Sequence, residues 1–212
     1  MDEITNLIFL RGTLAGRPAF SHTARGETFW GFPLEVRRLS GTSDVVNVIA
    51  KRALLDAAEP GEGDKVCVTG EVRSFNNKSG VGSRLVITVY AKELTFARGP
   101  DANTVTLRGT LCRRPNLRCT PMGRVICDMM TAVNRRYGRS DYLPCIAWGR
   151  LAEEADNWDT GTKVLLTGRL QSRTYTKLLE EGPVERVAYE ISLSSGEIIP
   201  APDGEFRGSP AY

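Results

Sequence analysis

Residues 6–14 read NLIFLRGTL and residues 103–111 read NTVTLRGTL, so the chain contains the same short segment twice. The two copies are offset by 97 residues (103 minus 6), and the same offset pairs further residues downstream. These pairs are Arg17 and Arg114, Gly26 and Gly123, Arg38 and Arg135, and Asp44 and Asp141. After one inserted residue in the second copy, Thr69-Gly70 matches Thr167-Gly168. A near-constant offset over this length indicates a duplicated structural unit.

Each copy has the pattern of five strands and one helix. Runs rich in apolar and β-branched residues, separated by Gly-rich or polar turns, predict the strands. They are residues 7–14, 29–36, 45–50, 65–72 and 84–94 in the first copy, and 104–111, 124–133, 141–147, 163–175 and 184–193 in the second. Ala, Leu and acidic residues at 53–58 and 151–157 predict a short helix between the third and fourth strands. This order is that of the OB-fold, so we expect an all-β chain of two tandem five-stranded barrels.

The duplication divides the chain into two domains and a tail. We expect one OB-fold in residues 1–98 and a second in residues 103–195, joined by a linker that contains Gly99-Pro100. From residue 196 to residue 212 the composition shifts to Pro, Gly and small polar residues, which predicts a flexible tail.

Composition and motifs exclude several classes of protein. No apolar run approaches the roughly 20 residues that span a bilayer, and the first residues lack a signal-peptide pattern, so we expect a cytoplasmic protein without a membrane partner. The five cysteines include no C-x-x-C pair and only one histidine, His22, is present, which argues against a metal site. Without a P-loop, dinucleotide-binding or nucleophile-elbow motif, we expect neither an enzyme nor a cofactor.

A basic segment distinguishes the second copy. Residues 113–139 contain seven arginines and a single acid, Asp128, whereas the net charge of the whole chain is only +3. Two interpretations are open: a solvated surface, or a groove that follows the phosphates of a nucleic acid. The near-absence of lysine and of compensating acids favours the groove.

The second copy also resembles the bacterial single-stranded DNA-binding protein family. The resemblance lies in VTLRGTLCRRPNLRCTPMG at residues 105–123, CIAWGRLAEEA at residues 145–155 and GTKVLLTGRLQSRTY at residues 161–175. Together these segments cover nearly all of the second copy, whereas the first copy resembles the family only through its duplication partner. The resemblance implies sequence-independent binding of single-stranded DNA in replication, recombination or repair, and a nucleoid-associated location.

The resemblance also implies where bases stack. At the family's aromatic positions this chain has Tyr137, Tyr142, Trp148 and Tyr175. Stacking on an aromatic ring tolerates any base, because every base has a π-face. Burial of each ring in the barrel core is the alternative interpretation. With the basic residues around them, the candidate nucleic-acid-binding residues are Arg113, Arg114, Arg118, Arg124, Arg135, Arg136, Tyr137, Arg139, Tyr142, Trp148, Arg150, Arg173 and Tyr175.

The first copy lacks this aromatic set. Ser40, Val45, Lys51 and Asn77 occupy the four equivalent positions. Trp30 lies inside a strand without basic neighbours in the sequence, which favours a structural role. We therefore expect the first domain to be degenerate, with a structural or dimerising role.

Two functions of different class remain open. The first is single-stranded DNA binding, in which a homodimer supplies the four OB-folds with which the resembled family works. The alternative is an OB-fold that binds other proteins, as a primosome or mobile-element accessory module. The family commonly recruits enzymes through a long acidic tail, and the short, weakly acidic C-terminal segment here argues against that role.

Overall fold

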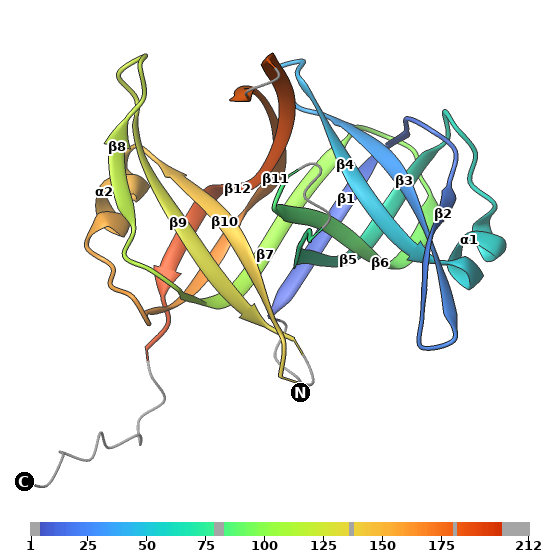
Figure 1. Cartoon of the computed structure of the whole chain (residues 1–212), viewed down its shortest axis with the longest axis horizontal. Helices are drawn as coiled ribbons and strands as arrows, with labels where there is room; N and C mark the ends of the chain where they lie inside the picture. The colour runs from blue at the N-terminus through green and yellow to red at the C-terminus, as the bar shows by residue number, and fades with distance from the viewer. Residues whose placement is uncertain (1–4, 79–82, 136–137, 180–181, 201–212) are drawn as a thin grey trace, which may run out of the picture.

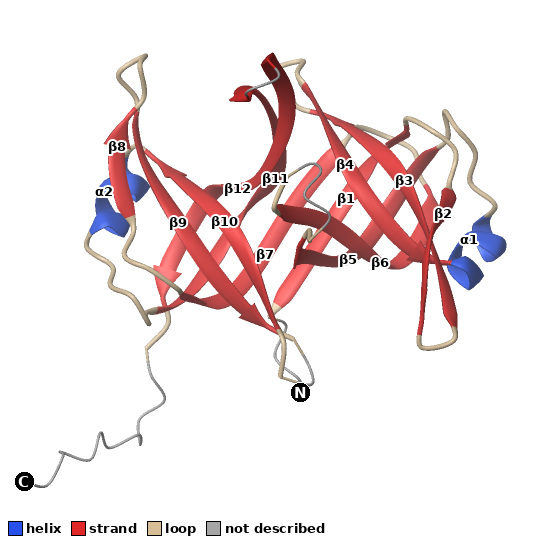
Figure 2. Cartoon of the chain, in the orientation of Figure 1, coloured by secondary structure: helices blue, strands red, loops and turns tan. Residues whose placement is uncertain are grey.

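The computed structural model describes residues 5–78, 83–135, 138–179 and 182–200. Within them the chain forms two barrels that lie side by side (Figure 1). The first barrel contains β1 (Asn6–Leu14), β2 (Ala19–Ala24), β3 (Glu27–Arg37), β4 (Ser43–Lys51), α1 (Arg52–Ala58), β5 (Lys65–Asn76) and β6 (Leu85–Phe96). The second contains β7 (Ala102–Leu111), β8 (Asn116–Cys119), β9 (Val125–Asn134), β10 (Ser140–Trp148), α2 (Arg150–Asp156), β11 (Lys163–Leu179) and β12 (Gly182–Ile198). The chain is all-β with tandem OB-folds, and Figure 2 shows its two helices at the outer ends of the molecule.

Each barrel has one strand more than the sequence predicts. The additional strands are β2 and β8, which pair with β3 and β9 respectively as hairpins. All residues of both strands are exposed, so neither strand shows the apolar alternation by which a strand is recognised in a sequence. The apolar pattern of the sequence therefore leaves out one exposed strand in each barrel.

The last two strands are also longer than predicted, and they change the boundary of the tail. β12 pairs with β11 as far as Ile198, where Val164 is the partner, so residues 196–198 are strand. The sequence did not reveal this end of β12, because it consists of Gly196 and two exposed residues and so lacks a buried apolar side chain. The rest of the predicted tail, from residue 201, lies outside the described residues. No helix in the described part of the chain is long and apolar enough to cross a membrane.

The repeated Leu-Arg-Gly-Thr-Leu segment forms the bent first strand of each barrel. In the first barrel this strand, β1, pairs with β5 along most of its length and with β3 at its end, where Leu14 pairs with Leu34. A Cβ at Gly12 would lie 2.3 Å from the Glu35 carbonyl oxygen, and one at Gly109 would lie 2.6 Å from that of Ala132. Glycine is therefore required at both positions, because only a residue without a Cβ allows the strands to approach this closely.

The two barrels join through their first strands. β1 pairs antiparallel with β7, and Ile8 pairs with Val105, its own counterpart at the 97-residue offset. Antiparallel pairing of equivalent strands about equivalent residues is the arrangement of a two-fold symmetric dimer. The chain therefore contains a pseudo-two-fold axis at Ile8 and Val105, and a continuous sheet runs β6-β5-β1-β7-β11-β12 across it.

Side-chain hydrogen bonds repeat about this axis. Asn6 bonds both backbone groups of Val72, at 2.7 and 2.9 Å, and Asn103 makes the same pair of bonds to Leu170. Across the interface, the carboxylate of Asp44 accepts a bond from the Ser172 backbone N–H at 2.8 Å.

The counterpart of Asp44 completes the symmetry. The carboxylate of Asp141, which is fully buried, accepts a bond of 2.5 Å from the Ser74 backbone N–H. Arg38 pairs with Asp44, and Arg135 with Asp141, within their own barrels. The repeated aspartates, each held by its repeated arginine, thus make hydrogen bonds across the interface between the barrels.

Candidate nucleic-acid interface

The strand register defines a single outer face on the second barrel. Because side chains alternate between the two sides of a strand, residues that pair directly share a side. Trp148 on β10 pairs with Ile126 on β9, and Tyr142 pairs with Ala132. The face continues onto β12, where the Trp148 indole donates a hydrogen bond of 3.1 Å to the Ser192 hydroxyl. The outer face includes Arg118 on β8, Asp128 and Met130 on β9, Tyr142 and Trp148 on β10, Arg186, Glu190 and Ser192 on β12, and Arg169, Gln171, Arg173 and Tyr175 on β11.

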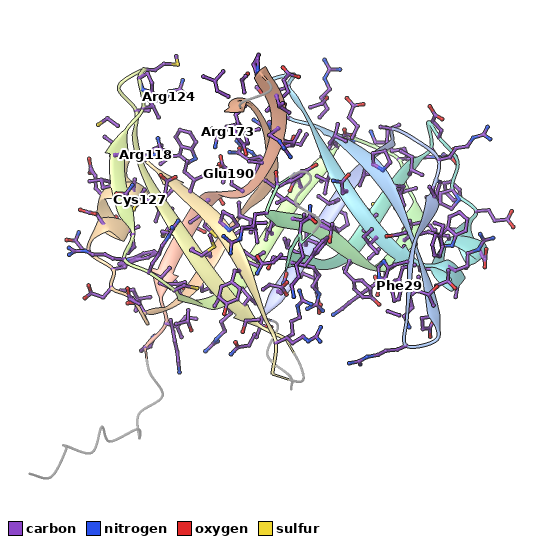
Figure 3. The ribbon with its side chains drawn as sticks, in the orientation of Figure 1. Phe29, Arg118, Arg124, Cys127, Arg173 and Glu190 are labelled. Carbon is purple, nitrogen blue, oxygen red and sulfur yellow. The ribbon has the colours of Figure 1, made fainter. Side chains whose placement is uncertain are left out.

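One border of this face is an arm in which β11 and β12 continue beyond the barrel (Figure 1). Along the arm, Gln171 pairs with Glu190, so the next two residues on that side of β11 are Arg173 and Tyr175. The Arg173 guanidinium lies 5.8 Å from the centroid of the Tyr175 ring, within cation–π range. Figure 3 shows Arg118, Arg124, Arg173 and Glu190 on the same side of the second barrel.

Three of the four aromatic residues singled out in the sequence lie on the outer face. Tyr142 is 51% exposed and Tyr175 is 37% exposed, while Trp148 is half-buried. None of the three belongs to the barrel core, which Ala147 and Leu143 enter from the opposite side of β10. Tyr137, together with Arg136, lies outside the described residues.

The arginines of the basic segment differ in how they are held. Arg113, Arg114, Arg124, Arg139 and Arg173 are exposed, so their charges face solvent. Arg150 is also exposed, and its guanidinium lies 3.5 Å from the Glu154 carboxylate on the next turn of α2.

Two of the predicted arginines are engaged within the protein. Arg135 bonds the buried Asp141 carboxylate through Nε at 2.6 Å and also donates to the Ser74 carbonyl oxygen of the first barrel. Arg118 pairs with Asp128 at 2.5 Å, and this hydrogen bond raises the pKa of Arg118. The structure therefore gives Arg135 a role in joining the barrels, which the sequence pattern could not distinguish from a phosphate contact.

The outer face also carries two acids, Asp128 from the basic segment and Glu190 from β12. Asp128 offsets Arg118, and Glu190 accepts a hydrogen bond of 2.7 Å from the Gln171 side-chain amide. Glu190 is distant in the sequence from the basic segment, and only the pairing of β11 with β12 brings it to this face. Asp128 and Glu190 therefore offset part of the positive charge of this side of the barrel, to which Arg124, Arg169 and Arg173 contribute.

The cysteines have no arrangement suited to a metal or to nucleophilic chemistry. Burial raises the pKa of the Cys145 thiol to about 12 and that of Cys127 to about 11, so both are protonated at neutral pH. In the described part of the chain, no three His, Cys, Asp or Glu side chains are grouped in a way that could hold a metal ion.

The equivalent face of the first barrel has an aromatic cluster that the sequence comparison missed. The Phe29 ring lies 4.9 Å from the His22 ring, nearly parallel to it, and 6.1 Å from the Tyr90 ring. Trp30 has no basic neighbour in the sequence but has one in space, because the Arg52 guanidinium lies 4.8 Å from its ring. Phe29 and Tyr90 occupy positions where the second barrel has Ile126 and Ser192. These are not aromatic positions of the family, so the resemblance did not indicate the cluster.

Comparison with known proteins identifies the family. The model of the single-strand binding protein family matches residues 102–198, which span the second barrel and its outer face. The chain belongs to the single-strand binding protein family. Members of this family are binding proteins, in agreement with the expectation that the chain is not an enzyme.

Individual members of the family support this assignment. Single-stranded DNA-binding protein A of Bacillus subtilis is 32% identical over 118 residues, covering 52% of this chain and 66% of the relative. The single-stranded DNA-binding protein of Clostridium tetani is 34% identical over 80 residues, covering 34% of this chain and 55% of the relative. The chain thus spans between about half and two thirds of the length of the curated relatives it matches.

A solved structure matches both barrels. The single-stranded DNA-binding protein of Thermus aquaticus aligns with 97% of this chain and 98% of its own, with a TM-score of 0.78 and 24% sequence identity. At this sequence identity the similarity shows the fold alone. Because 97% of the chain aligns, that fold includes both barrels.

Proposed function

We propose that this chain binds single-stranded DNA without sequence preference, mainly on the outer face of its second barrel. The observation that carries the proposal is the placement of Tyr142, Trp148 and Tyr175 on one face, with Arg173 beside Tyr175. The names of the family relatives, which are single-stranded DNA-binding proteins, support the same ligand. Such a protein acts wherever duplex DNA is opened, in replication, recombination and repair, in the cytoplasm and at the nucleoid.

Aromatic rings provide the affinity that distinguishes single strands from duplex. Each stacked base is stabilised by about 1–3 kcal/mol, and the bases of an intact duplex are not available for such stacking. Tyr142 and Tyr175 are exposed enough to receive a base on one side of the ring. Trp148 is fixed by its hydrogen bond to Ser192, so its ring is oriented before DNA binds.

The exposed arginines provide the sequence-independent part of the affinity. Arg113, Arg114, Arg124, Arg139 and Arg173 have charges that face solvent and can contact phosphates. Asp128 and Glu190 on the outer face disfavour phosphates beside them. We therefore infer that the phosphates follow the exposed arginines and avoid these two acids, while the bases reach the aromatic rings.

The first barrel is proposed to hold the second in place and to make weaker contacts of its own. The paired Asp44 and Asp141 networks support the structural role. The Phe29, Tyr90 and His22 cluster supports a secondary contact with DNA, because Lys51 pairs with Phe29 on the same face.

We also propose that the chain forms a homodimer with four OB-folds. The outward side of the continuous sheet carries the half-buried apolar side chains Leu7 and Phe9 on β1 and Leu165 on β11. An exposed sheet surface with apolar residues near a pseudo-two-fold axis is suited to pairing with a second copy. The alternative of a protein-interaction module is not favoured, because it does not explain the aromatic residues on the outer face.

Tyr142 offers the most direct test of this function by substitution. Replacing Tyr142 with Ala should weaken binding of an oligo-dT by about 1–3 kcal/mol, whereas Tyr142→Phe keeps the ring and should bind nearly as the wild type does. Fluorescence anisotropy with a labelled oligonucleotide measures both. Equal affinity of the Ala variant and the wild type would show that bases do not stack here.

A further inference from the structure

A cavity lies between the two barrels, next to the outer face. It has a volume of about 490 Å³ and is lined by Tyr142, Met130 and Ser140 of the second barrel and by Asn76, Arg84 and Leu85 of the first. This volume is within the range of pockets that enclose small organic ligands, roughly 300–1,000 Å³. The cavity is therefore large enough for one nucleobase.

Contacts between β5 and β10 fix the walls of this cavity. The Tyr142 backbone N–H donates a hydrogen bond of 2.7 Å to the Ser74 hydroxyl, and the neighbouring Ser74 N–H is bonded to Asp141. These bonds hold the β5–β6 hairpin of the first barrel against the start of β10, where Tyr142 lies (Figure 1). The wall from the first barrel is thus positioned by the interface that joins the barrels.

The pseudo-two-fold axis relates this cavity to a second cleft, which is closed. In that cleft Tyr189 takes the place of Ile87, and its hydroxyl donates a hydrogen bond of 3.0 Å to the Val45 carbonyl oxygen. The Asn47 side chain donates to the same hydroxyl at 3.2 Å. Tyr189 therefore bridges β12 and β4, whereas in the described part of the chain no ring bridges Ile87 to the second barrel, and the space beside Tyr142 is open.

The chemistry of the open cavity fits a base with its phosphate. Tyr142 offers a ring for stacking, and Leu85 and Met130 offer apolar contact for a base. Asn76 and Ser140 supply donors and acceptors for the edge of a base, and the exposed Arg84 at the rim can contact a phosphate. A duplex could not supply a base to this position without unpairing it.

We propose that this cavity is a base-binding pocket shared by both barrels, in which one unpaired nucleotide of the bound strand inserts between Tyr142 and the β5–β6 hairpin. The proposal rests on the proposed function, since it assigns the first barrel a direct part in the same binding event. It predicts that a base stacked on Tyr142 of the second barrel also contacts Asn76 and Leu85 of the first barrel.

Filling the cavity tests the proposal. Leu85→Trp places an indole in the space, and binding of a dT oligonucleotide should weaken by about fivefold or more, the lower bound for loss of one stacked base. Val187→Trp is the matched control, because Val187 occupies the equivalent position beside the closed cleft and is 44% exposed. This control should bind within about twofold of the wild type, a difference smaller than the effect of one stacked base.

A second variant keeps the test decisive if Leu85→Trp fails to fold, and photo-crosslinking adds a second readout if it folds. Arg84→Ala removes an exposed charge, and it should reduce the salt dependence of binding by about one phosphate contact. Photo-crosslinking of an oligonucleotide that contains 5-iododeoxyuridine should label Tyr142 in the wild type and in Val187→Trp, and lose that label in Leu85→Trp. If the wild type binds, unchanged affinity in a folded Leu85→Trp or an unchanged salt dependence in Arg84→Ala would overturn the shared pocket alone. Absence of wild-type binding would overturn the proposed function.

Discussion

Individual arginines of the second barrel have the same sequence signal but different environments. Arg135 is bonded to the buried Asp141 and to the Ser74 carbonyl oxygen, whereas Arg173 is exposed beside Tyr175 on the outer face. A charge already satisfied inside the protein cannot contact a phosphate without breaking those bonds. From these environments we propose that Arg135 acts in stability and Arg173 in binding.

These two arginines give a paired prediction. Arg173→Ala should lower the slope of log K against log salt by about 0.7, the value for one phosphate contact on a single strand, with little change in stability. Arg135→Ala should leave that slope unchanged and lower the free energy of unfolding by about 1.5–3 kcal/mol, as expected for loss of hydrogen bonds to a charged group. Salt titrations and urea unfolding measure the two quantities, and an exchange of the two phenotypes would contradict the assignment.

At the scale of elements, the strands with apolar alternation were predictable from the sequence and the exposed strands were not. β1 and its copy β7 repeat an inward-facing pattern, and the duplication revealed them both. β2 is exposed throughout, so the sequence contained no periodic signal for it. The aromatic residues of the outer face were predictable because they occupy the family's positions, whereas Glu190 and the Phe29–Tyr90 contact depend on pairing between distant strands.

The β-bulge in β11 gives a prediction at the same scale. The register of β11 and β12 shifts between Thr167 and Gly168, and a Cβ at Gly168 would lie 2.3 Å from the Ser192 carbonyl oxygen. Gly168→Ala should therefore destabilise the chain by about 1–3 kcal/mol through overpacking of backbone against backbone. Gly61→Ala is the matched control, because the closest atom to its Cβ would be at 3.5 Å, and its unfolding midpoint in urea should change little. Equal midpoints for the two variants would show that the bulge does not require glycine.

At the scale of the whole molecule, one chain already contains the symmetry of a dimer. β1 and β7 pair about Ile8 and Val105, and the hydrogen bonds of Asn6 and Asn103 repeat on the two sides of the axis. The two halves have diverged beside this shared interface: Tyr189 of the second barrel bonds the first barrel in one cleft, and the other cleft is open beside Tyr142. The duplication thus separates an interface, which both copies retain, from a binding face, which each copy has modified.

The proposed homodimer has a simple test. Light scattering should give a mass near 46.6 kDa, twice the 23.3 kDa of the chain. Phe9→Glu on the outward side of the continuous sheet should shift the mass toward the monomer, because burying an unpaired charge in an apolar contact is unfavourable. Leu39→Glu, at a fully exposed turn, should leave the mass unchanged. A wild-type mass of one chain at micromolar concentration would contradict the dimer.

The measurement that tests the central claim most directly compares a single strand with a duplex of the same length. Fluorescence anisotropy of labelled oligo-dT, a mixed-sequence strand and the annealed duplex should be recorded at several salt concentrations with the wild-type chain. Because the rings of the outer face require unpaired bases, we expect the two single strands to bind with similar affinity and the duplex much more weakly. The single-strand affinities should fall linearly with log salt, by about 0.7 per phosphate contacted. Equal affinity for the duplex and the single strands, or no binding to either, would contradict the proposed function.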